Sequence, residues 1–391
     1  MGKLQNFLLA GLTALLAVVG AELLLSWLLP FPDPYAGAKI DNDFIPSAHQ
    51  PNTTLQIEIE EGLPGLSGTN SFTTNNVGLR GEPLSQPKPD GEVRIFLIGG
   101  STAECLGISD GESIDRVLQV ALQDHAPAGL SVRVYNAGKS GDRSPDHVAM
   151  LTQRILHLEP DVVVVVAGIN DLLGAMHGYD YLHPAGRTFS LWRSLPLLAT
   201  EFQIPRRLHA LARRMRPGER AVLEEVGWKT TYREKAALQR SKPVTDALPT
   251  TDLGHFDTNM TTIAGLAEAH DFDLVLMTQA STWSSSVDPE ARDWHWMRYR
   301  NDFVYGEEVM DEALEQYNDV TRRIAADRRL MLYDLAAEAP KSLDLFIDDV
   351  HFNVAGAAYA ADGLARSLLD RDIWHTADTA ANPAAIIPEG R

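Results

Sequence analysis

Residue types that support nucleophilic catalysis stand at expected strand ends in this chain. Ser101 comes directly after an apolar run at 93–98 and two glycines, and His351 follows Asp348 by three residues near the C-terminal end. A neutral serine is a poor nucleophile until a base removes its proton, and a histidine oriented by a carboxylate is the usual base. We therefore expect Ser101 to be the nucleophile of an acyl-transfer site, with His351 and Asp348 as its base pair.

Acyl transfer also needs hydrogen-bond donors for the oxyanion that develops on the substrate. Loss of one such donor typically costs about 100- to 1000-fold in rate. The candidate donors are the backbone amides of Ser101 and Gly141 and the side-chain amide of Asn170. Gly141 and Asn170 follow the expected strands at 132–135 and 162–166. Because the carboxyl ends of parallel strands share one edge of a sheet, we expect these donors to meet there.

Each of these motifs is degenerate when it stands alone. Gly-x-Ser and Asp-x-x-His also occur at Ser67, Ser140, Asp180 with His183, and Asp252 with His255. Position favours Ser101, because it follows a buried strand and glycines that allow the backbone to turn sharply. The alternatives are structural: Ser101 as a helix cap, Asn170 as a turn residue and His351 as a surface residue.

The elements that must position these residues alternate between strand and helix. Apolar or β-branched runs predict strands at 93–98, 132–135, 162–166, 273–277 and 330–333. Helical patterns predict helices at 112–124, 144–158, 252–270, 307–326 and 354–369. The valine run at 162–166 is typical of a central parallel strand that is covered on both faces. The pattern predicts a doubly wound three-layer α/β/α sandwich with a central parallel sheet over 93–372.

Three further segments lie outside this alternation. Residues 31–92 are rich in Pro, Asn, Thr and Gly and predict an irregular stalk. Residues of about 172–250 carry helical pieces with many arginines and no strand signal, which predicts a helical insertion over one end of the sheet. The tail at 373–391 is rich in Ala and Pro and is expected to be loose.

The N-terminal segment at 1–30 predicts a transmembrane anchor. An almost unbroken apolar run covers 7–29, which is long enough to cross a bilayer and longer than the core of a cleaved signal peptide. Lys3 before the run and acidic residues after it favour an N-in orientation, with the catalytic body outside the cytoplasm. Glu22 lies inside the run, where it either marks a partner or reaches the outer interface.

Composition limits the classes of partner and cofactor. A formal net charge of -19 argues against a nucleic-acid partner, because phosphate binding rests on clustered Lys and Arg. Small molecules, glycans or proteins of the cell envelope are the expected partners. Cys105 is the single cysteine, which excludes an intramolecular disulfide and a multi-cysteine metal site.

The candidate residues resemble a known set in their order and setting. The four blocks that give the SGNH (GDSL-type) hydrolases their name are matched by Ser101, Gly141, Asn170 and His351, and Asp348 completes the last block. The resemblance covers 93–369 apart from the insertion.

The resemblance implies a flavodoxin-like three-layer fold and hydrolysis or transfer of ester-linked acyl groups. It also implies a site that needs no metal or cofactor. One departure is visible, because Gly100 and Thr102 flank the serine where the eponymous sequence has Asp and Leu.

The expected function is hydrolysis of ester-linked small acyl groups, acetyl in the first instance, on envelope glycans. An O-acyltransferase and a non-catalytic binding module of an envelope complex are the alternatives. Aromatic residues after the fourth strand either stack on sugar rings or pack the insertion; they are Trp283, Trp294, Trp296 and Tyr299. The arginines of the insertion either contact anionic polymer or lipid, or form a solvated face.

Overall fold

The computed structural model describes most of the chain, in two compact units. The described residues are 2–30, 49–59, 62–179, 202–214, 236–237, 239–300, 302–371 and 373–374. The smaller unit is Met1–Ala38 with Ala185–Val226, and the larger unit is Lys39–Pro184 with Gly227–Arg391. The predicted C-terminal tail lies almost entirely outside the described residues.

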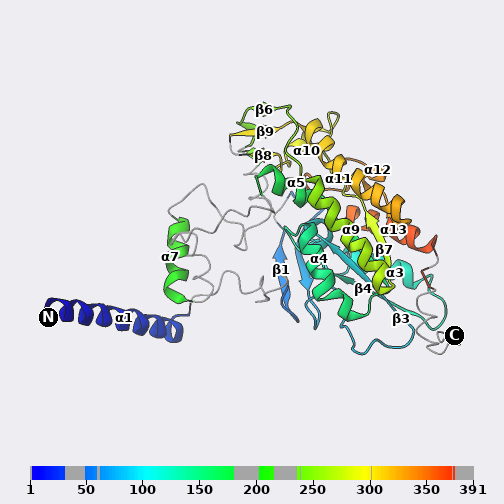
Figure 1. The fold of residues 1–391 in the computed structure, drawn as a ribbon. Helices are drawn as coiled ribbons and strands as arrows, with labels where there is room; N and C mark the ends of the chain where they lie inside the picture. The colour runs from blue at the N-terminus through cyan, green and yellow to red at the C-terminus, as the bar shows by residue number, and fades with distance from the viewer. Residues whose placement is uncertain are drawn as a thin grey trace, which may run out of the picture. The chain divides into compact units, whose positions relative to one another are not determined.

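The larger unit is built on a parallel sheet of five strands, in the order β10-β7-β5-β3-β4. Figure 1 labels β3, β4 and β7 of this sheet. The strands are β3 (Glu92–Gly99), β4 (Ser131–Asn136), β5 (Val162–Val166), β7 (Asp273–Met277) and β10 (Met331–Tyr333). All neighbouring strands run parallel. The predicted three-layer α/β/α sandwich is therefore confirmed.

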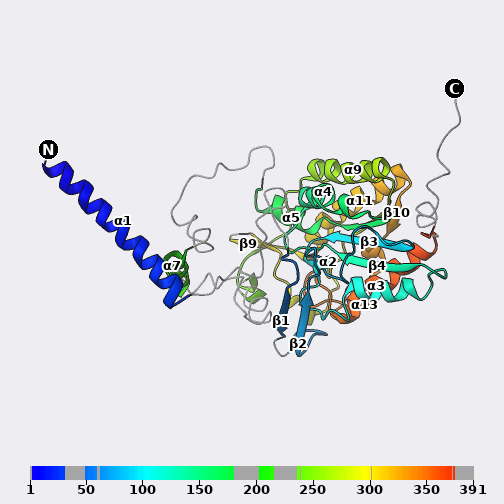
Figure 2. The same cartoon turned by 90° about the horizontal axis from the view of Figure 1, so that it is seen from below.

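Helices cover both faces of this sheet. The longer ones are α3 (Ile114–Gln123), α4 (Ser144–Gln153), α9 (Leu253–His270), α11 (Glu307–Arg328) and α13 (Val354–Leu369). The shorter ones are α2 (Ser101–Glu104), the 3-10 helix η1 (Ile155–Leu158), α5 (Ile169–Met176), α10 (Pro289–Arg292) and α12 (Leu335–Glu338). Figure 2 shows α4, α9 and α11 on one side of the sheet and α3 and α13 on the other.

The two faces of the sheet form two separate hydrophobic cores. Along β3, Ile95 and Leu97 belong to the core under α3 and α13, whereas Phe96 and Ile98 belong to the core under α4, α9 and α11. Successive side chains of a strand point to opposite faces, so a fully apolar strand is what a sheet covered on both sides requires. All five valines of β5 are buried for this reason.

One predicted helix is divided in the structure. The helix expected over 144–158 ends as α4 at Gln153, and the chain continues as η1. The break falls at Arg154, whose φ of -139° is not helical. Arg143, and not Ser144, occupies the N-cap, because the Ser144 hydroxyl donates to the Asp171 carboxylate at 2.6 Å.

The described part of the segment predicted to be an irregular stalk, residues 49–59 and 62–92, belongs to the larger unit and contains two strands. Strands β1 (Thr54–Glu58) and β2 (Thr69–Thr73) pair antiparallel. Arg80 is buried; its backbone pairs with that of Asn136 in β4, and its guanidinium donates to the carbonyl of Cys105 at 3.1 Å. These contacts join the backbone and the side chain of Arg80 to backbone groups far along the chain. The spacing of apolar residues in the sequence gives no sign of them.

The insertion contains a strand that the sequence did not indicate. β6 (Val244–Thr245) pairs with β9 (Phe303–Tyr305), which in turn pairs with β8 (Tyr299–Arg300). A two-residue strand is too short to show an alternating pattern, which explains why it was missed.

The smaller unit holds two helices, α1 (Gly2–Leu28) and α7 (Gln203–Arg214). Residues Leu9–Leu28 of α1 meet the length and hydropathy criteria of a membrane span, and a signal sequence meets the same criteria. The Glu22 carboxylate accepts hydrogen bonds from the backbone N–H groups of Gln203 and Ile204, the latter at 2.8 Å. Glu22 therefore caps the first turn of α7.

Two helical glycines provide a test of the packing between α13 and the sheet. A Cβ added at Gly363 would lie 2.0 Å from the hydroxyl of the buried Tyr333, so Gly363→Ala should lower the free energy of unfolding by about 1–3 kcal/mol. A Cβ at Gly265 in α9 meets nothing within 4 Å, so Gly265→Ala should raise it by roughly 0.5–1 kcal/mol. Urea unfolding measures both, and a neutral Gly363→Ala would contradict the tight packing.

Candidate active site

Ser101 lies at the first position of α2, immediately after β3. The two glycines before it are required by close neighbours. A Cβ at Gly99 would lie 2.7 Å from Cγ1 of Val166, and a Cβ at Gly100 would lie 2.4 Å from Nδ2 of Asn170. Only glycine leaves room for the turn from β3 into α2 while Asn170 stays beside it.

The structure brings Ser101, His351 and Asp348 together in one hydrogen-bond chain. Nε2 of His351 lies 2.7 Å from Oγ of Ser101, and Nδ1 lies 2.7 Å from Oδ2 of Asp348. The segment that carries Asp348 and His351 leads into α13, which begins at Val354. Both nitrogens of the imidazole are thus engaged, and the Ser101 hydroxyl is at the end of the chain.

Asp348 is held as an anion by several donors. Its Oδ1 accepts the backbone N–H groups of Val350 at 3.0 Å and His351 at 2.9 Å, and its Oδ2 accepts the indole N–H of Trp296 at 2.9 Å. Burial alone would raise the pKa of Asp348, but the His351 charge and these hydrogen bonds lower it. Burial alone would likewise lower the pKa of His351, and the Asp348 carboxylate raises it above its ordinary value.

Asp349, next in the chain, organises the neighbouring aromatic segment. Its carboxylate accepts the indole N–H of Trp283 at 2.7 Å and the backbone N–H of Trp296 at 2.7 Å. Its side chain has no exposed surface, and burial raises its pKa. The two carboxylates together therefore fix the segment that follows β7.

The structure shows how the four aromatic residues after β7 are placed. Trp283 and Trp294 are buried, at 0% and 3% exposed, and Trp296 and Tyr299 are half-buried. The indoles of Trp283 and Trp296 serve as hydrogen-bond donors to the buried carboxylates. Their packing role, which the sequence left open, is the one that the structure shows.

Asn170 is held by a hydrogen bond of its own side chain and by the contacts of the next residue, Asp171. Its Nδ2 donates to the carbonyl of Asp142 at 2.8 Å, which leaves the second N–H of the amide for another acceptor. The next residue, Asp171, accepts the Ser144 hydroxyl, and burial raises the pKa of Asp171 to about 6. The amide of Asn170 therefore stands between the Gly141 loop and the turn before Ser101.

Gly141 is needed for its backbone conformation. Its φ is +85°, a region that favours glycine, whereas a Cβ there meets nothing within 4 Å. The positive φ alone is thus enough to favour glycine at this position. On either side, Ser140 bonds Glu104 and the Asp142 carbonyl bonds Asn170, so the loop is held next to α2.

Glu104 holds this loop, and no motif in the sequence singled it out. It is buried, and its Oε2 accepts both the backbone N–H of Ser140 at 2.9 Å and the Ser140 hydroxyl. Its Oε1 lies 2.8 Å from Nε2 of His49 and 3.6 Å from Nζ of Lys139. Burial would raise the pKa of Glu104, but the contacts with His49 and Lys139 lower it.

A small apolar pocket adjoins Ser101 and His351. Its remaining lining is Leu66, Thr102, Cys105, Leu106, Gly107, Ile108, Ile347 and Phe352. Leu66 comes from the segment that was predicted to be a stalk. The pocket thus offers a small apolar space beside the Ser101 hydroxyl.

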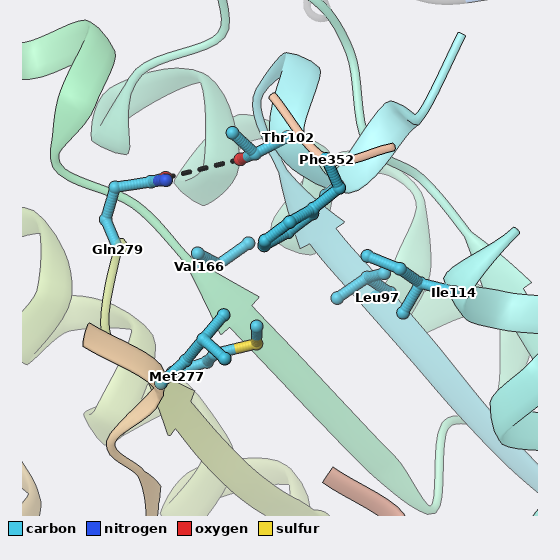
Figure 3. Close-up of a pocket in the computed structure, with 9 residues that line it drawn as sticks. Leu97, Thr102, Ile114, Val166, Met277, Gln279 and Phe352 are labelled. Carbon is cyan, nitrogen blue, oxygen red and sulfur yellow. Dashed lines mark hydrogen bonds between the residues drawn. The ribbon is translucent and has the colours of Figure 1, made fainter. Parts of the chain in front are cut away.

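A second small cavity lies between α2 and the carboxyl ends of β3, β5 and β7. Figure 3 shows Leu97, Ile114, Val166, Met277 and Phe352 around it, with a hydrogen bond of 3.2 Å between the side chains of Thr102 and Gln279. Thr102 and Phe352 line both cavities.

The sheet and the residues gathered at its carboxyl edge have the architecture of the SGNH class of ester hydrolases. The model of the GDSL-like Lipase/Acylhydrolase family matches residues 97–359, and the chain belongs to this family. The chain is accordingly an ester hydrolase, as its sequence predicted.

Solved structures similar to this chain share little sequence identity with it. An acetyl xylan esterase, AlAXEase, is 16% identical with a TM-score of 0.40, over 71% of this chain and 100% of its own. Axe2, an acetylxylan esterase from Geobacillus stearothermophilus, is 17% identical with a TM-score of 0.37, over 72% and 95%. TesA is 15% identical with a TM-score of 0.40, over 70% and 97%. No curated protein matches the chain.

The indole of Trp296 provides a test of how Asp348 is held. Trp296→Phe removes one donor, so we expect a loss of about 1.5–3 kcal/mol in the free energy of unfolding, the usual contribution of a hydrogen bond to a charged group. We also expect about a tenfold lower kcat for ester hydrolysis, the effect of about 1.4 kcal/mol in the transition state.

The matched control is Trp283→Phe, which removes an indole donor from Asp349 instead. Trp283→Phe should lower the free energy of unfolding about as much as Trp296→Phe does, but it should lower kcat less. Equal losses of activity in the two variants would show that Trp296 acts through stability alone.

Proposed function

We propose that the chain is a serine esterase in which Ser101 is the nucleophile, His351 the general base and Asp348 the residue that orients the imidazole. The observation that carries this proposal is the unbroken hydrogen-bond chain from Asp348 through His351 to Ser101. A second Asp-x-x-His pair forms between Asp252 and His255, with 2.8 Å between Oδ2 and Nδ1, but it lies at the start of α9 and does not follow a strand of the parallel sheet.

In the acylation step, Oγ of Ser101 forms a bond to the ester carbonyl carbon while Nε2 of His351 takes the hydroxyl proton. The resulting oxyanion accepts hydrogen bonds from the proposed donors, the amides of Ser101 and Gly141 and the side chain of Asn170. The imidazolium then gives its proton to the leaving alcohol as the carbon–oxygen bond breaks. Asp348 stays ionised throughout, consistent with its lowered pKa.

Deacylation repeats these steps with water as the nucleophile. His351 takes a proton from water, the hydroxide oxygen bonds to the acyl carbon, and the proton returns to Oγ of Ser101 as the acid leaves. No cofactor enters either half of the cycle.

The proposed substrate is a small acyl ester, acetyl in the first instance, carried by a glycan of the cell envelope. Support for a small acyl group comes from the small apolar pocket beside Ser101, whose lining includes Leu66, Ile108 and Phe352. Support for an envelope glycan comes from the proposed location. Trp283 and Trp294 are buried and do not support sugar stacking.

The proposed location is a membrane, with α1 as an uncleaved single span. Its apolar stretch Leu9–Leu28 covers roughly 30 Å at about 1.5 Å per residue, the thickness of the hydrocarbon core. Lys3 before the stretch supports an N-in orientation, which would place the catalytic unit outside the cytoplasm.

The catalytic assignment predicts that Ser101→Ala and His351→Ala abolish ester hydrolysis without unfolding the protein. Asp348→Asn should lower kcat by about 10⁴-fold, because the imidazole loses the group that selects its tautomer. A fluorophosphonate probe should label the peptide that contains Ser101.

The control for these variants is His255→Ala, which removes the other Asp-x-x-His imidazole and should keep wild-type activity. Near-wild-type activity and probe labelling in purified Ser101→Ala protein would contradict the assignment of Ser101 as the nucleophile. Circular dichroism of each variant separates loss of chemistry from loss of fold.

The acyl pocket predicts a preference for short chains. We expect kcat/KM for acetyl esters to exceed that for octanoyl esters, and acetate to be released from acetylated polysaccharide. A preference for octanoyl by more than about tenfold, roughly 1.4 kcal/mol, would point to a longer acyl cleft and contradict the proposed substrate.

A further inference from the structure

Helix α7 of the insertion is attached to the apolar helix α1 by its first turn. Both carboxylate oxygens of Glu22 are used, one for the N–H of Gln203 and one for the N–H of Ile204. The Arg207 guanidinium donates to the carbonyl of Leu29, just beyond the end of α1, and to the Gln203 side chain at 3.0 Å. These contacts hold the start of α7 beside the last two turns of α1, between Glu22 and Leu29.

The level of Glu22 along α1 can be placed relative to the end of the apolar stretch. Glu22 precedes Leu28 by six residues, which corresponds to about 9 Å along a helix. Amphipathic helices that lie in a membrane interface bury their apolar face by roughly 5–10 Å at the boundary of headgroups and acyl chains. The distance of Glu22 from the end of the apolar stretch therefore falls within the depth at which an interfacial helix lies.

The contact also explains a carboxylate inside the apolar stretch. An ionisable side chain at membrane depth is costly, and it is found where it has partners. The first N–H groups of a helix have no intrahelical acceptors and carry partial positive charge. The Glu22 carboxylate supplies acceptors to the N–H groups at the start of α7, and these N–H groups supply the hydrogen bonds that the carboxylate needs.

The surface around the start of α7 suits acyl chains. Phe202 and Leu208 are 47% and 51% exposed, and Leu28 and Leu29 at the end of α1 are 54% and 64% exposed. Ile204 and Leu208 stand four residues apart, on one side of α7. Within the smaller unit, apolar surface therefore continues from the span onto the insertion helix.

We propose that α7 is a second membrane contact, seated in the headgroup and acyl-chain boundary at the C-terminal end of α1 and held there by Glu22. The occupant of its exposed apolar surface is the lipid bilayer. Arg207, bonded to Leu29 where the apolar stretch ends, places a cation at the level of the lipid phosphates. This inference rests on the proposed membrane span of α1 and adds the insertion to the anchor.

The test places an environment-sensitive fluorophore on single cysteines of the full chain in phosphatidylcholine vesicles with a minor fraction of phosphatidylglycerol. Cys105 is buried and burial raises its pKa to about 12, so the introduced thiols react selectively. The positions are Phe202→Cys in the α7 region, Leu28→Cys in α1 and Val120→Cys on α3, which is exposed on the catalytic unit.

The readout is quenching by phosphatidylcholine that is spin-labelled near the top of its acyl chain. We expect quenching at Phe202→Cys close to that at Leu28→Cys, and above that at Val120→Cys. Quenching at Phe202→Cys no greater than at Val120→Cys, with Leu28→Cys quenched, would overturn the inference about α7. Absence of quenching at Leu28→Cys would instead overturn the proposed membrane span.

A second set of variants tests Glu22 as the holding residue. Glu22→Ala should lose the quenching at Phe202→Cys and keep it at Leu28→Cys, while the matched Glu22→Gln, which retains an acceptor oxygen, should keep most of it. Unchanged quenching at Phe202→Cys in Glu22→Ala would show that Glu22 does not hold α7, and would overturn the inference.

Discussion

A carboxylate with no exposed surface, Asp348, is the constraint around which the larger unit is arranged. A buried charge is strongly destabilising unless it is paired and hydrogen-bonded. Two backbone N–H groups, one imidazole and one indole meet that requirement at Asp348, and they come from two segments about 50 residues apart. The need to satisfy one anion thus fixes the orientation of His351 and the path of the chain through Trp296.

The opposite edge of the site depends on close approach instead of charge. Gly99 and Gly100 let the strand end pack against Val166 and Asn170, and Gly141 adopts a backbone conformation that other residues avoid. Glu104, one turn after Ser101, then ties the Gly141 loop to α2 through Ser140. Backbone donors can be aimed at one point only when the segments that carry them are held this tightly.

The sequence predicted the sheet well because its signals are local. The strands at 162–166 and 273–277 and the helix at 354–369 have the predicted bounds, since continuous apolar runs and a capped helical period require no distant partner. Ser101, Gly141 and Asn170 follow β3, β4 and β5, and Asp348 and His351 lie just before α13. What the sequence could not show depends on partners far along the chain. Arg80 reads as a loop residue until its acceptors near Cys105 are known, and Trp283 reads as an exposed aromatic until Asp349 is placed beside it.

The hydroxyl of Ser101 and the imidazole of His351 are separated by 250 positions in the chain. During synthesis, every fragment that ends between Ser101 and Asp348 contains the serine but neither His351 nor Asp348. Contacts at such long range form late, because the intervening chain must first be ordered at an entropic cost. A nascent chain therefore carries Ser101 without its hydrogen-bond partner, and the hydrogen-bond chain can form only after the segment that leads into α13 has been synthesised.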